Sequence, residues 1–257
     1  MSSLEVERDG PVLRATLSNP GRRNAITWPM YDALEQIETA VADDPGIRVV
    51  VIRGAGGEAF AAGTDIRQFT DFTTGAQGVE YEHRVGRVIA SLLRIRVPVV
   101  AVVEGPAVGA GLAIAACSDL VVATPDAVFG APVARTLGNT LPPAVVARLH
   151  QRLGSGRTMA MLLTARLLSA TEAANAGFVA DVVERDALDK QVAELLDRIC
   201  ANAPLTLASL KEIERRVLRD GAAAEADDVL ASVYGSHDFR AGVAAFLEHR
   251  PVEWEGR

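Results

Sequence analysis

The sequence predicts an α/β fold with a largely parallel sheet. Short, β-branched apolar runs alternate with segments of helical spacing through most of the chain. Two of those runs end in loops of small residues that each open a helix. From about Asp186 onward the pattern is almost entirely helical. With 257 residues, 49% hydrophobic and 23% charged, the chain can bury a full core.

The N-terminal third begins with two strands joined at Asp9-Gly10, a pair typical of a hairpin turn. Thr27 is placed to cap a helix, and Pro29 falls in the first turn of that helix. A short apolar run then predicts a buried strand, and a second helix follows the glycine-rich stretch after it. The predicted elements are strands 4–8 and 12–17, helix 28–41, strand 48–53 and helix 79–93.

The strand and helix alternation then repeats. A β-branched run ends at Glu104-Gly105-Pro106, and a helix of small residues follows. The predicted elements are strand 97–103, helix 109–117, strands 119–123 and 178–183, and helices 187–202, 205–219, 222–234 and 239–249. The helical tail could be a second domain, a cap or an oligomerisation arm.

Composition excludes several classes of function. The net charge of −7 and the pI of about 5.2 leave no electrostatic footprint for nucleic acid. The first residues do not resemble a signal peptide, and no apolar run approaches the roughly 18 residues of a membrane span. We therefore expect a cytoplasmic protein. Cys117 and Cys200 lie in helical apolar patterns and are expected to be core thiols, and no cysteine–histidine cluster suggests a metal.

The first loop (residues 54–66) follows a buried strand, and its glycines and alanines leave the backbone open. Asp65 can cap a helix that starts at Ile66. A loop of this kind can direct free N–H groups at an anion. The phosphate-loop pattern of Gly-x-x-x-x-Gly-Lys-Ser/Thr is absent. A purely structural turn is the alternative interpretation.

The second loop (residues 104–113) also follows a buried strand and opens a helix, whose N-terminus carries positive partial charge. Small residues let a ligand approach this backbone closely. Alone, the loop could reflect only tight packing of helix on sheet. Together, the two loops can each supply one N–H to a shared oxygen. That is an oxyanion hole, in which one donor contributes roughly 3 kcal/mol in the transition state.

At these motifs the sequence resembles the crotonase (enoyl-CoA hydratase/isomerase) family, and the resemblance covers essentially the whole chain. The spacing of the two loops and the terminal Phe-x-x-x-Arg-Pro make the resemblance specific. The matching segments are Arg23-Asn24-Ala25-Ile26, Ala59-Phe60-Ala61-Ala62-Gly63-Thr64-Asp65-Ile66, Pro98 to Gly105, Gly109-Ala110-Gly111, Cys117-Ser118-Asp119-Leu120 and Phe246-Leu247-Glu248-His249-Arg250-Pro251.

The resemblance implies a spiral core of ββα turns over residues 1–190. It also implies a C-terminal helical region over residues 191–257 that packs in homotrimers or dimers of trimers, the two forming one functional unit. It places the oxyanion-hole donors on the N–H groups of Ala62 and Ala110. The substrate is an acyl-CoA thioester, and no cofactor is expected beyond its coenzyme A. The resemblance assigns substrate contacts to Arg23, Ala25, Ala62, Gly63, Thr64, Asp65, Ile66 and Ala110, and CoA phosphate contacts to His249 and Arg250.

One departure from the family pattern bears directly on the reaction. Family hydratases carry two glutamates that hold and activate water, and Ala113 and Val133 occupy those positions here. Counting back from Leu137-Gly138 instead places Ala134 at the second position. Neither register supplies a carboxylate. Because each general acid–base group contributes about 10²- to 10⁴-fold, we do not expect ordinary two-glutamate hydration.

Other polar residues could replace the missing carboxylates. Arg135, Asn139 and Thr140 lie in the segment of the second glutamate, where the dehalogenase branch of the family carries an aspartate nucleophile at the position of Thr140. His83 lies on the helix that borders the acyl pocket in this family, and Tyr81 and Glu82 rank below it. Glu104 ends a strand at a turn, where a structural role is favoured.

Three hypotheses about function remain: two are enzymatic activities known in the family, and one is a protein without catalytic activity. The first is an enzyme that stabilises a thioester enolate, as a hydratase, an isomerase or a relative of these. The second is another acyl-CoA reaction, such as hydrolysis, decarboxylation or dehalogenation. The third is a CoA-binding protein without turnover. Both loops favour the first two hypotheses, whereas the loss of both glutamates favours the second and third.

Overall fold

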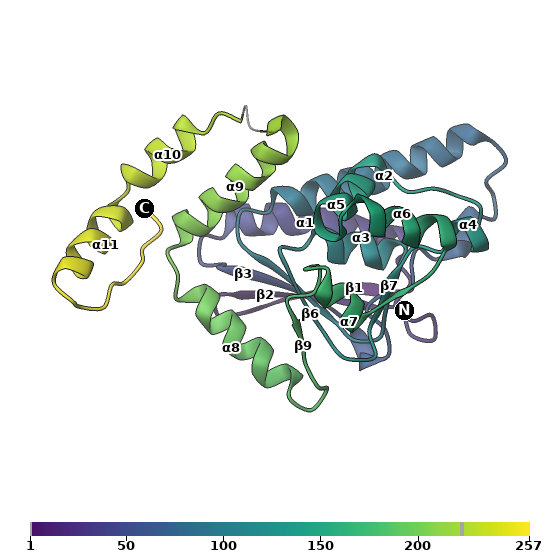
Figure 1. Ribbon diagram of the computed structural model, residues 1–257, viewed down its shortest axis with the longest axis horizontal. Coiled ribbons are helices and arrows are strands. Elements are labelled where there is room, and N and C mark those ends of the chain that lie inside the picture. Colours follow the sequence, from purple (N-terminus) through teal and green to yellow (C-terminus); the bar gives the residue numbers. More distant parts are fainter. Residues whose placement is uncertain (1, 222–223) are drawn as a thin grey trace.

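The computed structural model describes residues 2–221 and 224–257 (Figure 1). Its main sheet has six strands in the order β1-β2-β3-β4-β6-β9. Within this sheet the β1–β2 hairpin is antiparallel and the other four pairs are parallel, in agreement with the largely parallel sheet that the sequence predicted. The strands are β1 (Ser3–Asp9), β2 (Val12–Ser18), β3 (Val49–Gly54), β4 (Val99–Val103), β6 (Leu120–Ala123) and β9 (Asp181–Val182).

A second sheet of three short strands, ordered β5-β7-β8, accompanies the first. Successive stretches of chain place one strand in each sheet: β4 is followed at once by β5, and β6 by β7. This alternation is the spiral of ββα turns that the family resemblance implied. The strands of the second sheet are β5 (Pro106–Val108), β7 (Val128–Gly130) and β8 (Leu168–Ser169).

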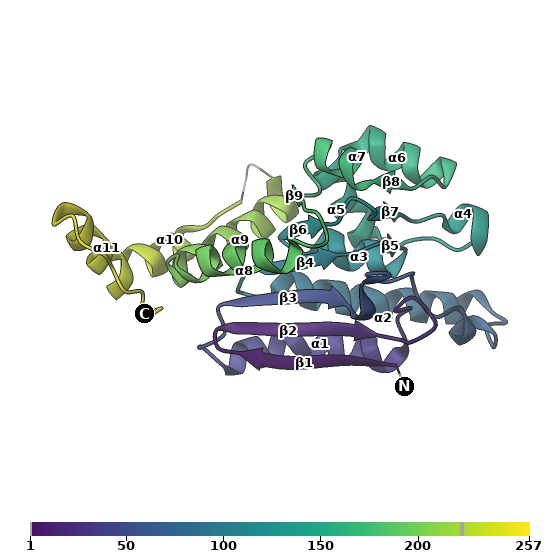
Figure 2. The same cartoon turned by 90° about the horizontal axis from the view of Figure 1, so that it is seen from below.

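Helices α1, α2 and α3 cover one face of the main sheet (Figure 2). Helix α1 presents buried Met30, Leu34, Ile37 and Val41 to the core, at the spacing of one helix face. Helix α2 lies against α1, and the Ser91 hydroxyl donates to the Glu35 carbonyl at 2.9 Å. The helices of the core are α1 (Trp28–Asp43), α2 (Gly75–Arg94), α3 (Ala110–Cys117), α4 (Val133–Thr136), α5 (Pro143–Leu153), α6 (Ser155–Thr164) and α7 (Ala170–Asn175), with short 3₁₀ turns η1 (Ala55–Gly57) and η2 (Ile66–Phe69).

The opposite face of the sheet is covered by α8 (Leu188–Cys200). Alternate residues of β3 point to opposite faces, so Val50 and Ile52 join the core under α1, whereas Val49 and Val51 pack with α8. Helix α8 buries Leu188 and Val192 on either side of the expected boundary at residue 190. The core therefore extends through the end of α8.

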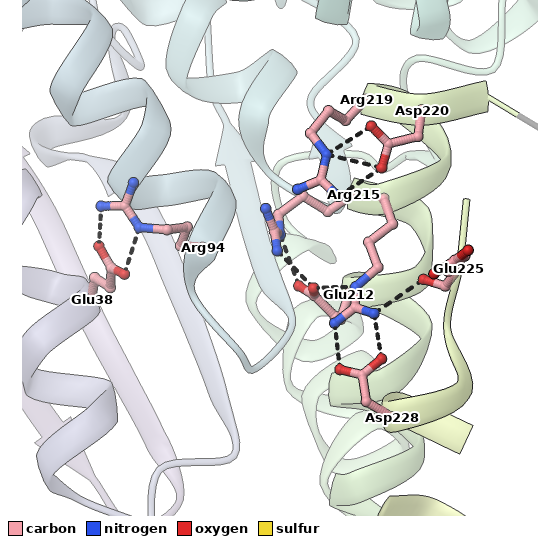
Figure 3. Close-up of polar contacts among 9 residues, drawn as sticks. Glu38, Arg94, Glu212, Arg215, Arg219, Asp220, Glu225 and Asp228 are labelled. Atoms are coloured by element: carbon pink, nitrogen blue, oxygen red, sulfur yellow. Dashed lines mark hydrogen bonds and ion pairs between the residues drawn. The ribbon is translucent and has the colours of Figure 1, made fainter. Parts of the chain in front are cut away.

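The remaining helices form a tail that extends away from the core (Figures 1 and 2). Lys211 attaches the tail to the core by donating to the Val97 carbonyl at 2.8 Å and pairing with Asp119. Arg216 joins Glu212 to Asp228 with bonds of 2.7 and 2.8 Å. Figure 3 shows Glu212 on α9 and Asp228 on α10. The start of the helix predicted over 222–234 falls partly outside the described residues. The tail helices are α9 (Pro204–Asp220), α10 (Asp227–Tyr234) and α11 (His237–Leu247).

Candidate active site

The two loops lie directly against each other. Ala61 and Ala107 form a parallel β-bridge, and the Val108 N–H donates to the Ala61 carbonyl at 2.9 Å. A Cβ atom at Gly111 would lie 2.2 Å from that same carbonyl oxygen, so only glycine fits there. The backbone of each loop is therefore fixed by the other.

A cavity of about 290 Å³ opens beside this contact. It brings together the expected donors, both positions of the missing glutamates and the middle of α2. Its walls are formed by Tyr31 of α1, by Ala62, Gly63, Thr64, Ile66 and Phe69, by Tyr81, Glu82 and Val85 of α2, by Val108, Gly109, Ala110 and Ala113, and by Pro132, Val133, Thr136, Leu137, Asn139, Thr140, Leu141 and Pro142.

Ala110 is the first residue of α3, and Gly109 turns the chain into the helix with φ of 55° and ψ of −112°. Within the described part of the chain, the N–H of Ala110 donates to no backbone or side-chain acceptor. It adjoins the cavity at the N-terminal end of the helix, where the partial charge is positive. Ala110 is one of the two donors that the family resemblance implied, and its N–H is unpaired beside the cavity.

Ala62 differs from Ala110. Its N–H donates to the Arg23 carbonyl oxygen at 3.0 Å, so of the two expected donors only Ala110 has an unpaired N–H among the described residues. The acceptor is held by a turn in which Arg23 and Asn24 have φ of 48° and 55°. The buried Asn24 side chain ties this turn to the first loop by donating to the Ala59 carbonyl at 2.8 Å. A ligand oxygen must share the Ala62 N–H with Arg23 or displace it.

The cavity decides between the two registers for the second missing glutamate. Val133 and Ala113 both line the cavity, whereas Ala134 is exposed and lies outside the lining. Both cavity positions carry small or aliphatic side chains, so neither can hold a water molecule through a carboxylate.

The one charged side chain in the cavity lining is Glu82. Its Oε2 atom is buried and has no hydrogen-bond partner among the described residues. Burial raises the pKa of this carboxyl group to about 6. Sequence reasoning ranked Glu82 below His83, which is exposed and lies outside the lining. Glu82 lies three positions before the buried Val85 and seven before the buried Ile89, so all three residues share one face of α2. A charged residue on this apolar face is the sequence signal that could have identified Glu82.

Three hydroxyl groups meet at the cavity wall. The Thr64 oxygen lies 2.6 Å from the Tyr31 hydroxyl and 2.8 Å from the Tyr81 hydroxyl. Burial raises the pKa of both tyrosines above its usual value, which keeps them neutral at physiological pH. The ring of Phe69 packs edge-on against Tyr81 at 4.9 Å between centroids. These side chains form an aromatic wall with hydroxyl groups at its centre.

The remaining predicted site residues divide into three groups. Gly63, Thr64, Ile66, Asn139 and Thr140 line the cavity, with Ile66 57% exposed. Four residues lie outside the lining: Arg23 and Ala25 on the turn beside Ala62, the exposed Arg135, and Asp65. The Asp65 carboxylate caps η2 and pairs with Arg67, and this pairing lowers the pKa of Asp65 to about 2. His249 and Arg250 lie beyond the end of α11, at the far end of the chain from α2 and α4 (Figure 1).

Two residues outside the cavity have structural roles. Glu104 is buried and accepts from Arg53 at 2.6 Å and from Arg185 at 2.8 Å, which confirms the structural role that the sequence favoured. Cys117 is buried, and desolvation raises its pKa to about 12.

Among the described residues no cluster of three or more histidine, cysteine, aspartate or glutamate side chains could hold a metal ion. None of the described helices has both the length and the apolarity that crossing a bilayer requires.

Comparison with known proteins agrees with this architecture. Residues 7–257 match the family model described as "Enoyl-CoA hydratase/isomerase". Carnitinyl-CoA dehydratases of Citrobacter koseri and Proteus mirabilis are each 33% identical over 99% of both chains. The crystal structure of an enoyl-CoA hydratase/carnithine racemase from Magnetospirillum magneticum covers 100% of this chain and 97% of its own, with a TM-score of 0.93 and 30% identity.

Fold and site together define a crotonase-type protein. The chain belongs to the enoyl-CoA hydratase/isomerase family, whose members are enzymes that act on coenzyme A thioesters.

Proposed function

We propose that this chain binds an acyl-CoA thioester in the cavity and stabilises negative charge on the thioester oxygen with backbone N–H groups. The observation that carries the proposal is the unpaired N–H of Ala110 at the start of α3, beside a cavity that the first loop also lines. Removing a proton next to a thioester places negative charge on the carbonyl oxygen. A fixed donor at a helix N-terminus stabilises that charge without reorganising.

Ala62 supplies the second donor in this proposal. Its N–H lies on the first loop, next to the cavity, and is already bonded to the Arg23 carbonyl. One N–H can serve two acceptors in a three-centre bond. The thioester oxygen then shares the Ala62 N–H with Arg23 and has the Ala110 N–H to itself.

The reaction at the acyl chain is not two-glutamate hydration in this proposal. The positions that would hold and activate water are Ala113 and Val133. The aspartate nucleophile of the dehalogenase branch has no counterpart either, because Thr140 occupies that part of the cavity wall. The chain therefore catalyses an enolate reaction that needs neither two carboxylates nor a carboxylate nucleophile.

Calorimetry with butyryl-CoA, crotonyl-CoA and carnitinyl-CoA tests the binding step, with free coenzyme A as the control. The three thioesters represent a saturated chain, an enoyl chain and the compound in the relatives' name. We expect at least one to bind more tightly than free coenzyme A. Failure of all three to bind at millimolar concentration would contradict the proposal.

Ala110→Val tests the position of the oxygen. A valine side chain crowds the space beside the N–H, so the rate on the best substrate should fall by about 100-fold or more. Ala110→Gly keeps the N–H and the space, and should change the rate little. Ala160→Val, at an exposed position of α6, is the matched control for a β-branched residue in a helix. Full activity in a folded Ala110→Val variant would place the site elsewhere.

We also propose that the tail joins copies of the chain into a homotrimer or a dimer of trimers. Phe246 and Leu247 of α11 are 81% and 72% exposed, which is unusual for large apolar side chains on a single chain. His249 and Arg250 follow α11, which lies at the opposite end of the molecule from α4 (Figure 1), and neither residue lines the cavity. In the assembly, these two residues are available to the coenzyme A bound by a neighbouring copy.

A further inference from the structure

Glu82 differs from the other buried carboxylates of the chain. Glu104 accepts from two arginines, Asp65 pairs with Arg67, and Asp238 accepts from the N–H groups of Glu255 and Gly256. Among the described residues, Glu82 Oε2 is the only buried carboxylate oxygen that lacks a hydrogen-bond partner. Burying such an oxygen without a partner costs free energy, so packing alone does not explain the glutamate.

The surroundings of Glu82 offer it no positive charge. Of the cavity side chains only Tyr31, Tyr81 and Glu82 itself can titrate, and both tyrosines are neutral hydroxyl groups. On α2 itself, Arg84 pairs with Asp32 at 2.5 Å and lies over the ring of Trp28, while His83 is exposed. The carboxyl group is therefore surrounded by apolar and neutral groups in a cavity large enough for an acyl chain.

Glu82 also shares the cavity with the oxyanion-hole donors and with the two positions that lack glutamates. Tyr81, Glu82 and Val85 form the α2 wall, and Ala110, Ala113 and Val133 contribute to the other walls. A carboxylate from α2 can thus take the place that side chains at 113 and 133 leave empty. Its raised pKa, about 6, lets it gain and lose a proton near neutral pH.

We propose that Glu82 is the catalytic base and acid of this enzyme, carrying one proton between two carbons of the bound acyl chain. This inference rests on the function proposed above. The carboxylate takes a proton from the carbon next to the thioester carbonyl. The electron pair of the broken C–H bond forms a C=C bond, and the carbonyl electron pair moves to the oxygen that the Ala110 N–H stabilises.

The substrate class that fits one carboxyl group is a 3-enoyl thioester. After the first step the negative charge is spread over the dienolate. Protonated Glu82 then returns its proton to the fourth carbon, and the double bond moves from C3=C4 to C2=C3. The proton removed equals the proton returned, so the reaction needs no water, metal or redox partner. Hydration would require a second group to activate water, and the cavity lining has no other carboxylate.

The test measures exchange of the α-protons of butyryl-CoA in D₂O by NMR, because exchange needs only the donors and the base. Glu82→Gln should slow exchange by about 100-fold or more, since a general base contributes about 10²- to 10⁴-fold. The same variant should lose conversion of 3-hexenoyl-CoA to 2-hexenoyl-CoA. Glu80→Gln, two positions away and exposed on the same helix, is the matched control and should keep both activities.

The pH dependence of the wild-type chain gives a second measurement that needs no variant. Because the base is the ionised carboxylate, exchange should rise with pH through about 6 and then level off. A profile that is flat between about pH 5 and about pH 8 would overturn the assignment. Glu82→Asp, which keeps the carboxylate one methylene further away, should retain the pH dependence at a lower rate.

Calorimetry of butyryl-CoA with the wild type and with Glu82→Gln separates the two proposals. If the wild type does not bind the thioester, the proposed function fails. If it binds but Glu82→Gln exchanges α-protons at the wild-type rate, or if the wild type itself exchanges none, only the role of Glu82 fails. Equal binding by both proteins together with loss of exchange in the variant supports both proposals.

Discussion

The N–H of Ala62 donates to the carbonyl oxygen of Arg23 at 3.0 Å. One of the two expected oxyanion-hole donors is therefore already bonded inside the chain, whereas the Ala110 N–H is not. Asn24 holds the Arg23 turn against the first loop through bonds to the carbonyls of Ala55 and Ala59. In the function proposed above, the two donors therefore differ before the thioester binds: one N–H is already paired and the other is not.

Amide hydrogen exchange measured by NMR should reveal this difference. When butyryl-CoA saturates the chain, we expect exchange at Ala110 to slow markedly, because a free N–H gains an acceptor. Exchange at Ala62 should change little, because that N–H is bonded before and after binding. A large change confined to Ala62 would show that the thioester oxygen lies away from the start of α3.

Hydration of crotonyl-CoA should be very slow in the wild type. Ala113→Glu together with Val133→Glu places carboxylates at both cavity positions and should raise the hydration rate by at least about 100-fold. Ala113→Glu with Ala134→Glu is the matched control, since residue 134 lies outside the cavity lining. An equal gain in the control would show that the register at Val133 is wrong.

The buried carboxyl group of Glu82 should make stability depend on pH. Its pKa is about 6 in the folded chain and 4.5 without burial, so the folded state binds the proton more tightly. The stabilisation from Glu82 is therefore fully present below about pH 4.5 and is lost as the pH rises through about 6.

Glu82→Gln, which imitates the protonated form, should then gain stability relative to the wild type at about pH 8 but not at about pH 4.5. Because the group is partly exposed, we expect a difference of about 1 kcal/mol in the free energy of unfolding, less than the full shift implies. Urea denaturation at the two pH values measures it. Glu80→Gln should show no such change. If the wild type is instead more stable than Glu82→Gln at the higher pH, burial does not raise the pKa of Glu82.

The tail should control assembly. Phe246→Asp and Leu247→Asp together place charge on the exposed apolar surface of α11 and should convert a trimer or hexamer into monomers, as measured by light scattering. Leu163→Asp, at a residue 73% exposed on α6, is the control and should leave the assembly intact. A monomeric wild type, or dissociation only in the control, would contradict the role of the tail.

The fold could be predicted where patterns are long. Helices α1, α2, α8 and α9 follow from apolar periodicity, because each extends over several turns, and strands β3 and β4 follow from uninterrupted β-branched runs. The second sheet could not be predicted, because β5, β7 and β8 have two or three residues each. No pattern develops over so short a length, and those strands exist because the spiral brings neighbouring turns together.

The candidate site divides in the same way. Both loops could be identified because small residues after buried strands form a local signal. The bonded state of the Ala62 N–H depends on the left-handed conformations of Arg23 and Asn24, which no glycine marks in the sequence. The place of Glu82 in the cavity could not be predicted, because it depends on which side chains surround the carboxyl group. Those neighbours are set by the packing of α2 beside residues 132–142.

The mutual contact of the two loops has a consequence for how this enzyme could change. The groups proposed to activate the thioester belong to the main chain, and the 2.2 Å approach at position 111 shows that the neighbouring backbone tolerates no added side chain there. The side chains that would act on the acyl group lie instead on α2 and on residues 132–142. New chemistry can therefore arise by replacing side chains on these two segments while the activating machinery stays intact, which makes them the positions to randomise in a directed-evolution library.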